Sequence, residues 1–138
     1  MIDDLTRKTF VGLADVLIPA AEGMPAASGV GVGEHLDRLL GLRPDLLEVF
    51  TRGMKACAGQ DPQRSAERLN REDPPALAAI GLIAAAAYYM DPPVRALIGY
   101  PGQENRPGDP DETPPYVANG MLKVVTDRGP IFRPTQKR

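Results

Sequence analysis

Few residues of this chain have the types and spacing that catalysis requires. Glu34 and His35 place a carboxylate beside an imidazole, a pairing that can serve as a general base and the group that orients it. Neighbouring residues on a helix point to different sides, however, and His35 is no better aligned with Asp37. The pattern therefore favours polar side chains on the outer face of an amphipathic helix over a catalytic pair.

The single cysteine, Cys57, and the single histidine, His35, limit the chemistry further. One thiol cannot form an internal disulfide, which fits a reducing compartment. A zinc or haem site would need a Cys/His spacing that the sequence lacks, and a glycine-rich phosphate loop is missing as well. We therefore expect that the chain by itself binds no flavin, haem or metal and is not an enzyme.

Three of the four tyrosines lie close together in the sequence, and a turn follows the third. The run Tyr100-Pro101-Gly102-Gln103 combines a proline that fixes φ with a glycine that tolerates positive φ, as a type II turn requires. Tyrosines are common anchors of protein interfaces because they join an apolar ring to a polar tip, and they are also ordinary covers of a small core. The sequence leaves both roles open for Tyr88, Tyr89 and Tyr100.

The elements that must position these residues are helices. Six stretches read as helical, and their apolar stripes follow the 3.6-residue period. The stretches are residues 10–18, 32–40, 44–58, 62–70, 76–89 and 94–98, with a loop at 20–33. The predicted fold class is therefore all-α: a small helical bundle in residues 1–99, followed by a long extended proline-rich C-terminal arm in residues 100–138.

Local residues mark several of the helix ends. Asp61, Asp73 and Asp91 each precede a proline, so the carboxylate can cap the helix while the proline takes a position whose N–H would be unpaired. Gly99 is placed to end the last of these helices. The buried stripe predicted for the third stretch consists of Leu46, Leu47, Phe50 and Met54. The stretch 76–89 is apolar nearly all round, which predicts a place at the centre of the bundle.

The arm shows no sustained period. Residues 104–115 are acidic and rich in proline, which favours an extended backbone, and residues 116–125 carry an apolar patch that can form one helical turn or a strand-like piece. Ile131 and Phe132 follow as a buried-looking pair between prolines. A structureless segment of this length is unusual inside a compact domain, so the arm either folds back on the bundle or lies on another protein.

Composition excludes several classes of partner. The net charge of −2, without a concentrated block of basic residues, argues against nucleic acid. The longest apolar run, residues 76–90, is shorter than the roughly 20 residues that cross a bilayer, so no membrane span is expected. Residues 6–10 only partly match a twin-arginine export signal, because Lys8 replaces the second arginine and Asp15 interrupts the apolar stretch. The sequence favours an uncleaved structural helix in a cytoplasmic protein, or a periplasmic one if it is exported with a partner or a signal has been removed.

The run from Tyr88 to Pro107, YYMDPPVRALIGYPGQENRP, with ADVLIP early in the chain and RGPIFRP near its end, resembles the gluconate 2-dehydrogenase subunit 3 family. Members of this family are small subunits of FAD-dependent dehydrogenases. The resemblance implies a non-catalytic accessory subunit that binds and stabilises a large FAD-containing subunit of the glucose-methanol-choline (GMC) type. That partner, which would oxidise a sugar, a sugar acid or a related alcohol, would hold the FAD and the catalytic histidines. The resemblance leaves open a cytochrome c subunit in the same hetero-oligomer.

The residues expected to bind the partner belong to the tyrosine corner, the turn after it and the end of the arm. They are Tyr88, Tyr89, Tyr100, Pro101, Gly102, Gln103, Ile131, Phe132 and Arg133. An alternative is a chaperone-like assembly or export escort for the same flavoprotein, since many members of the family carry a twin-arginine signal for their partner. The degenerate signal in this chain weighs against export.

Overall fold

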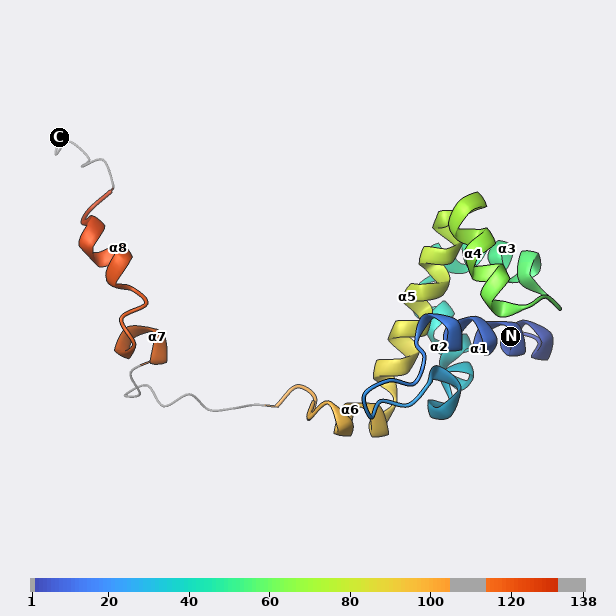
Figure 1. The fold of residues 1–138 in the computed structure, drawn as a ribbon, viewed down its shortest axis with the longest axis horizontal. Helices are drawn as coiled ribbons and strands as arrows, with labels where there is room; N and C mark the ends of the chain where they lie inside the picture. The colour runs from blue at the N-terminus through green and yellow to red at the C-terminus, as the bar shows by residue number, and fades with distance from the viewer. Residues whose placement is uncertain (1, 105–113, 132–138) are drawn as a thin grey trace. The chain divides into compact units, whose positions relative to one another are not determined.

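The computed structural model describes residues 2–104 and 114–131. The chain divides into two compact units, Met1–Gly102 and Gln103–Arg138, which we call the body and the C-terminal segment and describe separately. The body contains α1 (Asp4–Leu17), α2 (Leu36–Leu42), α3 (Leu47–Cys57), α4 (Pro62–Glu72), α5 (Pro74–Met90) and α6 (Pro92–Leu97) (Figure 1). Three 3₁₀ helices accompany them: η1 (Ala27–Val30), η2 (Val32–His35) and η3 (Pro44–Leu46). No strand occurs among the described residues, so the prediction of an all-α fold is confirmed.

Helix α5 organises the body. Its N-terminal end lies with α3 and α4, its C-terminal end leads into α6, and it also contacts α1 and α2 (Figure 1). The α5 residues that are buried in these contacts are Ala76, Ala79, Ile80, Ile83, Ala84, Ala87 and Tyr88. The predicted central position therefore holds for one side of α5, while the opposite side faces solvent.

Two large rings and one glycine define how the helices meet. Phe10 of α1 and Phe50 of α3 are fully buried, and their ring centroids lie 5.7 Å apart at an interplanar angle of 58°. A Cβ on Gly53 would lie 3.0 Å from both the Ala76 Cβ and the Ile80 Cδ1. Helices α3 and α5 thus approach closely at the one position of α3 where no side chain separates them.

The predicted loop at residues 20–33 is wrong in part, because it contains η1 and leads into η2. Ala27, Val30 and Val32 are buried, and the Ala27 N–H donates to the Ile18 carbonyl at 3.1 Å. Small residues allow this short tight helix to pack on α1, a tertiary contact that no period in the sequence announces.

The predicted stripe of the third stretch also needs one correction. Pro44–Leu46 is a 3₁₀ turn, and α3 itself begins only at Leu47. Leu47, the first residue of α3, is 43% exposed, whereas Phe50 and Met54 are buried as predicted. The inward face of α3 consists of Phe50, Gly53, Met54 and Cys57.

Two of the three predicted Asp-Pro caps form. The Asp61 carboxylate accepts the Arg64 N–H at 2.9 Å, and that of Asp73 accepts the Ala76 N–H at 3.3 Å. The third predicted cap is wrong, because the Asp91 side chain makes no capping hydrogen bond. At the start of α6 only the backbone carbonyl of Asp91 accepts a hydrogen bond, from the Arg95 N–H at 3.1 Å. The side chain is partly buried, and its Oδ1 has no partner within the described part of the chain.

Gly99 ends α6 as predicted. Its φ is +66°, its N–H donates to the Ala96 carbonyl at 3.1 Å, and the Tyr100 N–H donates to the Arg95 carbonyl at 2.8 Å. This pair of hydrogen bonds is the Schellman arrangement, which needs a left-handed residue and so favours glycine.

The C-terminal segment contains α7 (Pro115–Ala118) and α8 (Lys123–Arg128). Residues 116–125 are thus helical where they are regular, and the strand-like alternative is wrong. Every described residue after Pro114 is exposed. Most of the predicted extended stretch, residues 105–113, lies outside the described residues.

Candidate protein-interaction surface

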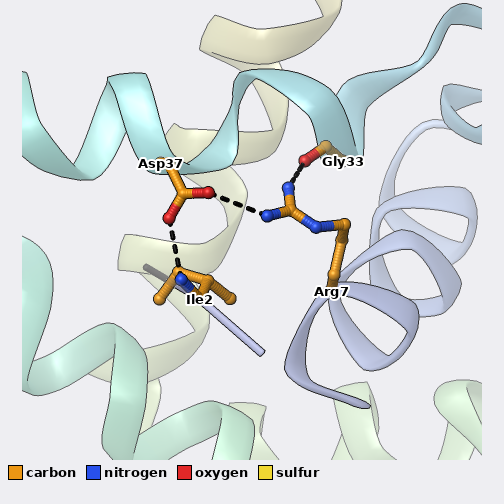
Figure 2. Close-up of polar contacts among 4 residues, drawn as sticks. All are labelled: Ile2, Arg7, Gly33 and Asp37. Carbon is orange, nitrogen blue, oxygen red and sulfur yellow. Dashed lines mark hydrogen bonds and ion pairs between the residues drawn. The ribbon is translucent and has the colours of Figure 1, made fainter. Parts of the chain in front are cut away.

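The structure gives Asp37 a structural role and leaves Glu34 and His35 apart from it. Asp37 accepts the Ile2 backbone N–H at 2.8 Å and the Arg7 guanidinium at 2.8 Å, while the other Arg7 nitrogen donates to the Gly33 carbonyl (Figure 2). The Ile2 hydrogen bond, followed by Arg7, lowers the pKa of Asp37. Within the described residues no hydrogen bond or ion pair joins any two of Glu34, His35 and Asp37. The group latches α1 to α2 and is not arranged as a base and its orienting group.

Tyr88 belongs to the core. Its side chain is 2% exposed, its hydroxyl donates to the Pro25 carbonyl at 2.7 Å, and burial raises its pKa. The hydroxyl thereby ties the segment before η1 to the end of α5. Of the two roles that the sequence left open, Tyr88 has the role of covering the core, and its buried side chain is not available for direct contact with a partner in this structure.

Tyr89 and Tyr100 are accessible. Tyr89 is 54% exposed and meets the Tyr88 ring edge-on, with centroids 5.4 Å apart at 88°. Tyr100 is 51% exposed and directly follows the end of α6, where Leu97 and Ile98 are also exposed. Val94 is the buried residue of α6, so the short helix turns one side chain inward and presents its last turn to solvent.

The three residues after Tyr100 are also near the surface. Gly102 has a φ of +96°, the value that the predicted turn requires at this position. Pro101 and Gln103 are exposed, and Gly102 is partly buried.

An apolar stripe that was not predicted from the sequence runs along the outer side of α5. Four residues at helical spacing face solvent there: Pro75, Ala78, Leu82 and Tyr89. We call them the α5 stripe. Leu82 is 47% exposed, and no charged residue interrupts the helix from Pro74 to Met90. A helix that is apolar all round does not reveal which side its neighbours will cover, so the only available signal was the missing polar face.

Beside the α5 stripe runs a groove of about 330 Å³ between α3 and α5. Its lining consists of Leu46, Val49, Pro75, Ala78, Ala79 and Leu82. The groove has no charged side chain in its wall, so any polar group placed in it would lose its water without a new partner. It suits an apolar side chain of another molecule.

The C-terminal segment exposes apolar side chains as well. Those on and beside α7 and α8 are Tyr116, Val117, Met121, Leu122, Val124 and Val125. Ile131 is 79% exposed, so in this structure it is not the buried residue that its setting between prolines suggested. Phe132 and Arg133 lie outside the described residues.

Groups that could carry other chemistry are scarce in the part of the chain that the structure describes. No three His, Cys, Asp or Glu side chains gather there as metal ligands would. Among the same residues, no helix combines the length and apolar character needed to cross a bilayer. Exposed apolar side chains are thus the main functional signal of the described surface.

Comparison with protein-family models finds no match, and comparisons with curated proteins and with solved structures find none either. The partner suggested by the sequence resemblance stays a prediction. What the geometry shows by itself is a helical body with an exposed apolar stripe along one side of α5.

Proposed function

We propose that the chain is the non-catalytic small subunit of a flavin-dependent oxidoreductase complex. In this proposal it binds and stabilises a large FAD-containing subunit of GMC type that oxidises a sugar, a sugar acid or a related alcohol. The α5 stripe is the observation that carries the protein-binding part of the proposal. Its uncharged residues occupy one side of a helix whose other side already forms the core.

The physical reason is the cost of leaving this stripe in water. Burying apolar surface is favourable by roughly 25 cal/mol per Å². Contiguous apolar patches that stay exposed on a folded protein therefore often mark the sites at which it binds another molecule. Ala78 and Leu82 alternate a small and a large side chain along the stripe, and the α3–α5 groove lies beside them. A partner that inserts an apolar side chain into the groove would cover both features.

The exposed end of α6 and the C-terminal segment extend the apolar surface available to a partner. Tyr89 and Tyr100 offer rings with polar tips, the type of residue that dominates the energetics of many interfaces. The segment adds Val124, Val125 and Ile131, all more than half exposed. A segment that orders on a partner pays the entropy of ordering, but it can wrap a large surface and bury such side chains there.

The identity of the partner rests on the resemblance of residues 88–107 and of RGPIFRP to the small-subunit family. A small subunit that binds only the folded flavoprotein would stabilise it by mass action, by about 2.7 kcal/mol when its free concentration is one hundred times the Kd. This stabilisation is a function in itself and requires no catalytic residue on the small chain.

The test is co-expression of the full chain with a tagged GMC-type flavoprotein encoded beside it in the same genome. We expect a stable complex that carries FAD in the large subunit, with a melting temperature of the flavoprotein above that of the flavoprotein alone. A genome with no such neighbour, or a flavoprotein that purifies alone at equal stability, would contradict the partner assignment.

One substitution tests the surface, with a matched control. Leu82→Asp places a carboxylate in the α5 stripe and should weaken association at least about tenfold, because it removes a leucine that the partner would bury and introduces an unpaired charge. Leu42→Asp makes the same change at a leucine that is 65% exposed at the end of α2 and does not line the α3–α5 groove. Equal binding by the two variants would exclude the α5 stripe from the interface.

The alternative role, an assembly or export escort, predicts a different outcome. The small chain would then bind the flavoprotein only during its maturation and would be missing from the purified active flavoprotein.

A further inference from the structure

The residues of the α5 stripe follow the spacing of a helix that packs along a second helix. Ala85, which is partly buried, lies between Leu82 and Tyr89 on the same side of α5. With it the exposed side reads Pro75, Ala78, Leu82, Ala85 and Tyr89, at alternating steps of three and four residues. We call these five residues the α5 row. Alternating steps of three and four are the a and d positions of a heptad, so the surface that fits this row is another helix aligned with α5.

Large and small side chains alternate along the α5 row. Leu82 and Tyr89 are large and are 47% and 54% exposed, whereas Ala78 and Ala85 are small. When a second copy of α5 lies antiparallel to the first, one register places Leu82 opposite Ala85 of the other copy. The same register places Tyr89 opposite Ala78, and twofold symmetry repeats both pairs. A parallel copy would set leucine on leucine and alanine on alanine, which crowds one layer and leaves a gap in the next.

Charge also favours the antiparallel copy. Helix α5 has no charged residue from Pro74 to Met90, so two copies meet along the α5 row without burying a charge. The helix dipole places partial positive charge at the N-terminal end and partial negative charge at the C-terminal end. An antiparallel pair sets each positive end beside the negative end of the other copy, whereas a parallel pair sets like ends together.

We propose that the chain forms a weak symmetric dimer in which the α5 row packs antiparallel on the α5 row of a second copy. From Pro75 to Tyr89 the row is about 21 Å long, and a helix with its side chains is about 10–12 Å wide. Each copy therefore contributes on the order of a few hundred Å², less than the roughly 800 Å² per partner of a standard interface. Standard interfaces begin at about micromolar affinity, so the Kd of this dimer should lie above about 1 µM.

A weak dimer has a consequence for the proposed function, although the dimer does not depend on that function. Leu82 and Tyr89 would be covered by a second copy while no other partner is bound. A flavoprotein that covers a larger area would displace the second copy by mass action, because the same side chains cannot serve both partners. Self-association would thus keep the α5 row out of water until the larger partner binds.

The test is sedimentation equilibrium of the full chain, where we expect reversible dimerisation with a Kd between about 1 µM and 1 mM. Leu82→Ala would oppose alanine to alanine, and Ala85→Leu would oppose leucine to leucine. Each variant alone should therefore dimerise about fivefold more weakly than the wild type, or worse. An equimolar mixture of the two variants should recover the affinity of the wild type, because the mixed dimer again opposes a leucine to an alanine in both layers.

The matched control is Leu42→Ala, which makes the same change at a leucine that is 65% exposed in α2, and it should dimerise like the wild type. Thermal melting curves establish that each variant is folded. Four results would each overturn the dimer: a wild-type chain that is monomeric at about 1 mM, a mixture that associates no better than its components, a stronger dimer of Ala85→Leu, or equal weakening by Leu42→Ala.

The dimer and the proposed function fail in different ways. A chain that stays monomeric and still co-purifies with the flavoprotein would refute the dimer and leave the proposed function standing. A chain that dimerises through the α5 row and does not bind the flavoprotein would contradict the proposed function and support the dimer.

Discussion

The body and the C-terminal segment contain similar residue types and use them in opposite ways. In the body, rings such as Phe10 and Phe50 are fully buried between helices. In the segment, Val124 and Ile131 are 71% and 79% exposed. Helices of four and six residues are too short to be stable by themselves or to offer a wide apolar stripe. Helical propensity is present in both units, and only the body joins enough stripes to make a core.

Polar contacts differ in the same way. Arg7 and Asp37 are 30 residues apart and connect α1 to α2 (Figure 2), whereas Lys123 and Asp127 are four residues apart on one helix. A contact between distant residues holds elements together, while a contact within one turn supports only that turn. Substitutions in the core of the body should therefore lower its stability, whereas substitutions in the segment should leave that stability unchanged.

The largest expected effect tests this division at two aromatic residues. Phe50→Ala should destabilise the body by about 3–5 kcal/mol, because it removes a fully buried ring that packs on Phe10 and leaves a cavity. Tyr116→Ala, at a ring that is 49% exposed in α7, should change the midpoint of urea unfolding very little. Similar losses at the two positions would show that the segment shares the core of the body.

The next effect concerns association and uses a truncation. Removing residues 130–138 should leave the melting temperature of the body unchanged, because the buried residues of the described part of the chain all lie before Gly99. If the segment lies on a flavoprotein, the loss of Ile131 and Phe132 should weaken the complex by about 2–5 kcal/mol, at roughly 1.5–3 kcal/mol for each buried side chain. The competing account, in which this pair completes the core of the chain itself, requires the truncated chain to melt at a lower temperature. Thermal unfolding and co-purification of the same protein separate the two accounts.

A smaller effect is expected where α3 and α5 approach each other closely, at Gly53. Gly53→Ala should cost roughly 1–3 kcal/mol, since the new methyl group would press on the backbone-bound Ala76 Cβ and move α3 away from α5. Gly41→Ala is the matched control in α2, where no heavy atom lies within 4 Å of the new Cβ. Helix propensity alone should make that variant more stable by up to about 1 kcal/mol. Chemical denaturation of the two variants and the wild type measures both changes. An increase in stability of Gly53→Ala as well as Gly41→Ala would show that α3 and α5 are not closely packed at Gly53.

The smallest expected effect is the pH dependence of the stability that Asp37 gains from its contacts with Ile2 and Arg7. The pKa of Asp37 is lowered from its ordinary value of 3.8, so the folded state favours the carboxylate. Its contribution to stability is present above the ordinary pKa and is lost as pH falls through the lowered pKa of the folded state. Asp37→Asn should therefore be less stable than the wild type at neutral pH and lose less stability on acidification below about pH 4. Asp127→Asn in α8 should have the same stability as the wild type at every pH. Equal shifts of the urea midpoint in both variants would contradict the distinction between the long-range Arg7–Asp37 pair and the local Lys123–Asp127 pair.

Much of the secondary structure follows from local sequence. Asp61 and Asp73 cap their helices, Gly99 ends α6, and Val32, Leu36, Leu39 and Leu40 face inward as their spacing predicts. These features depend on residues within one or two turns of each other, which is the range over which side chain and backbone compete for hydrogen bonds. The all-α class was predictable for this reason.

Features that depend on contacts between distant parts of the chain were not predictable from the sequence. The burial of Tyr88 depends on the Pro25 carbonyl, 63 residues away, while the adjacent Tyr89 faces solvent. The α5 stripe exists because the neighbouring helices cover only one side of an evenly apolar helix. The sequence alone determined where the six α-helices of the body form and where several of them end, because those preferences are local. Tertiary structure decided which sides are covered, because packing depends on the neighbours that meet each surface.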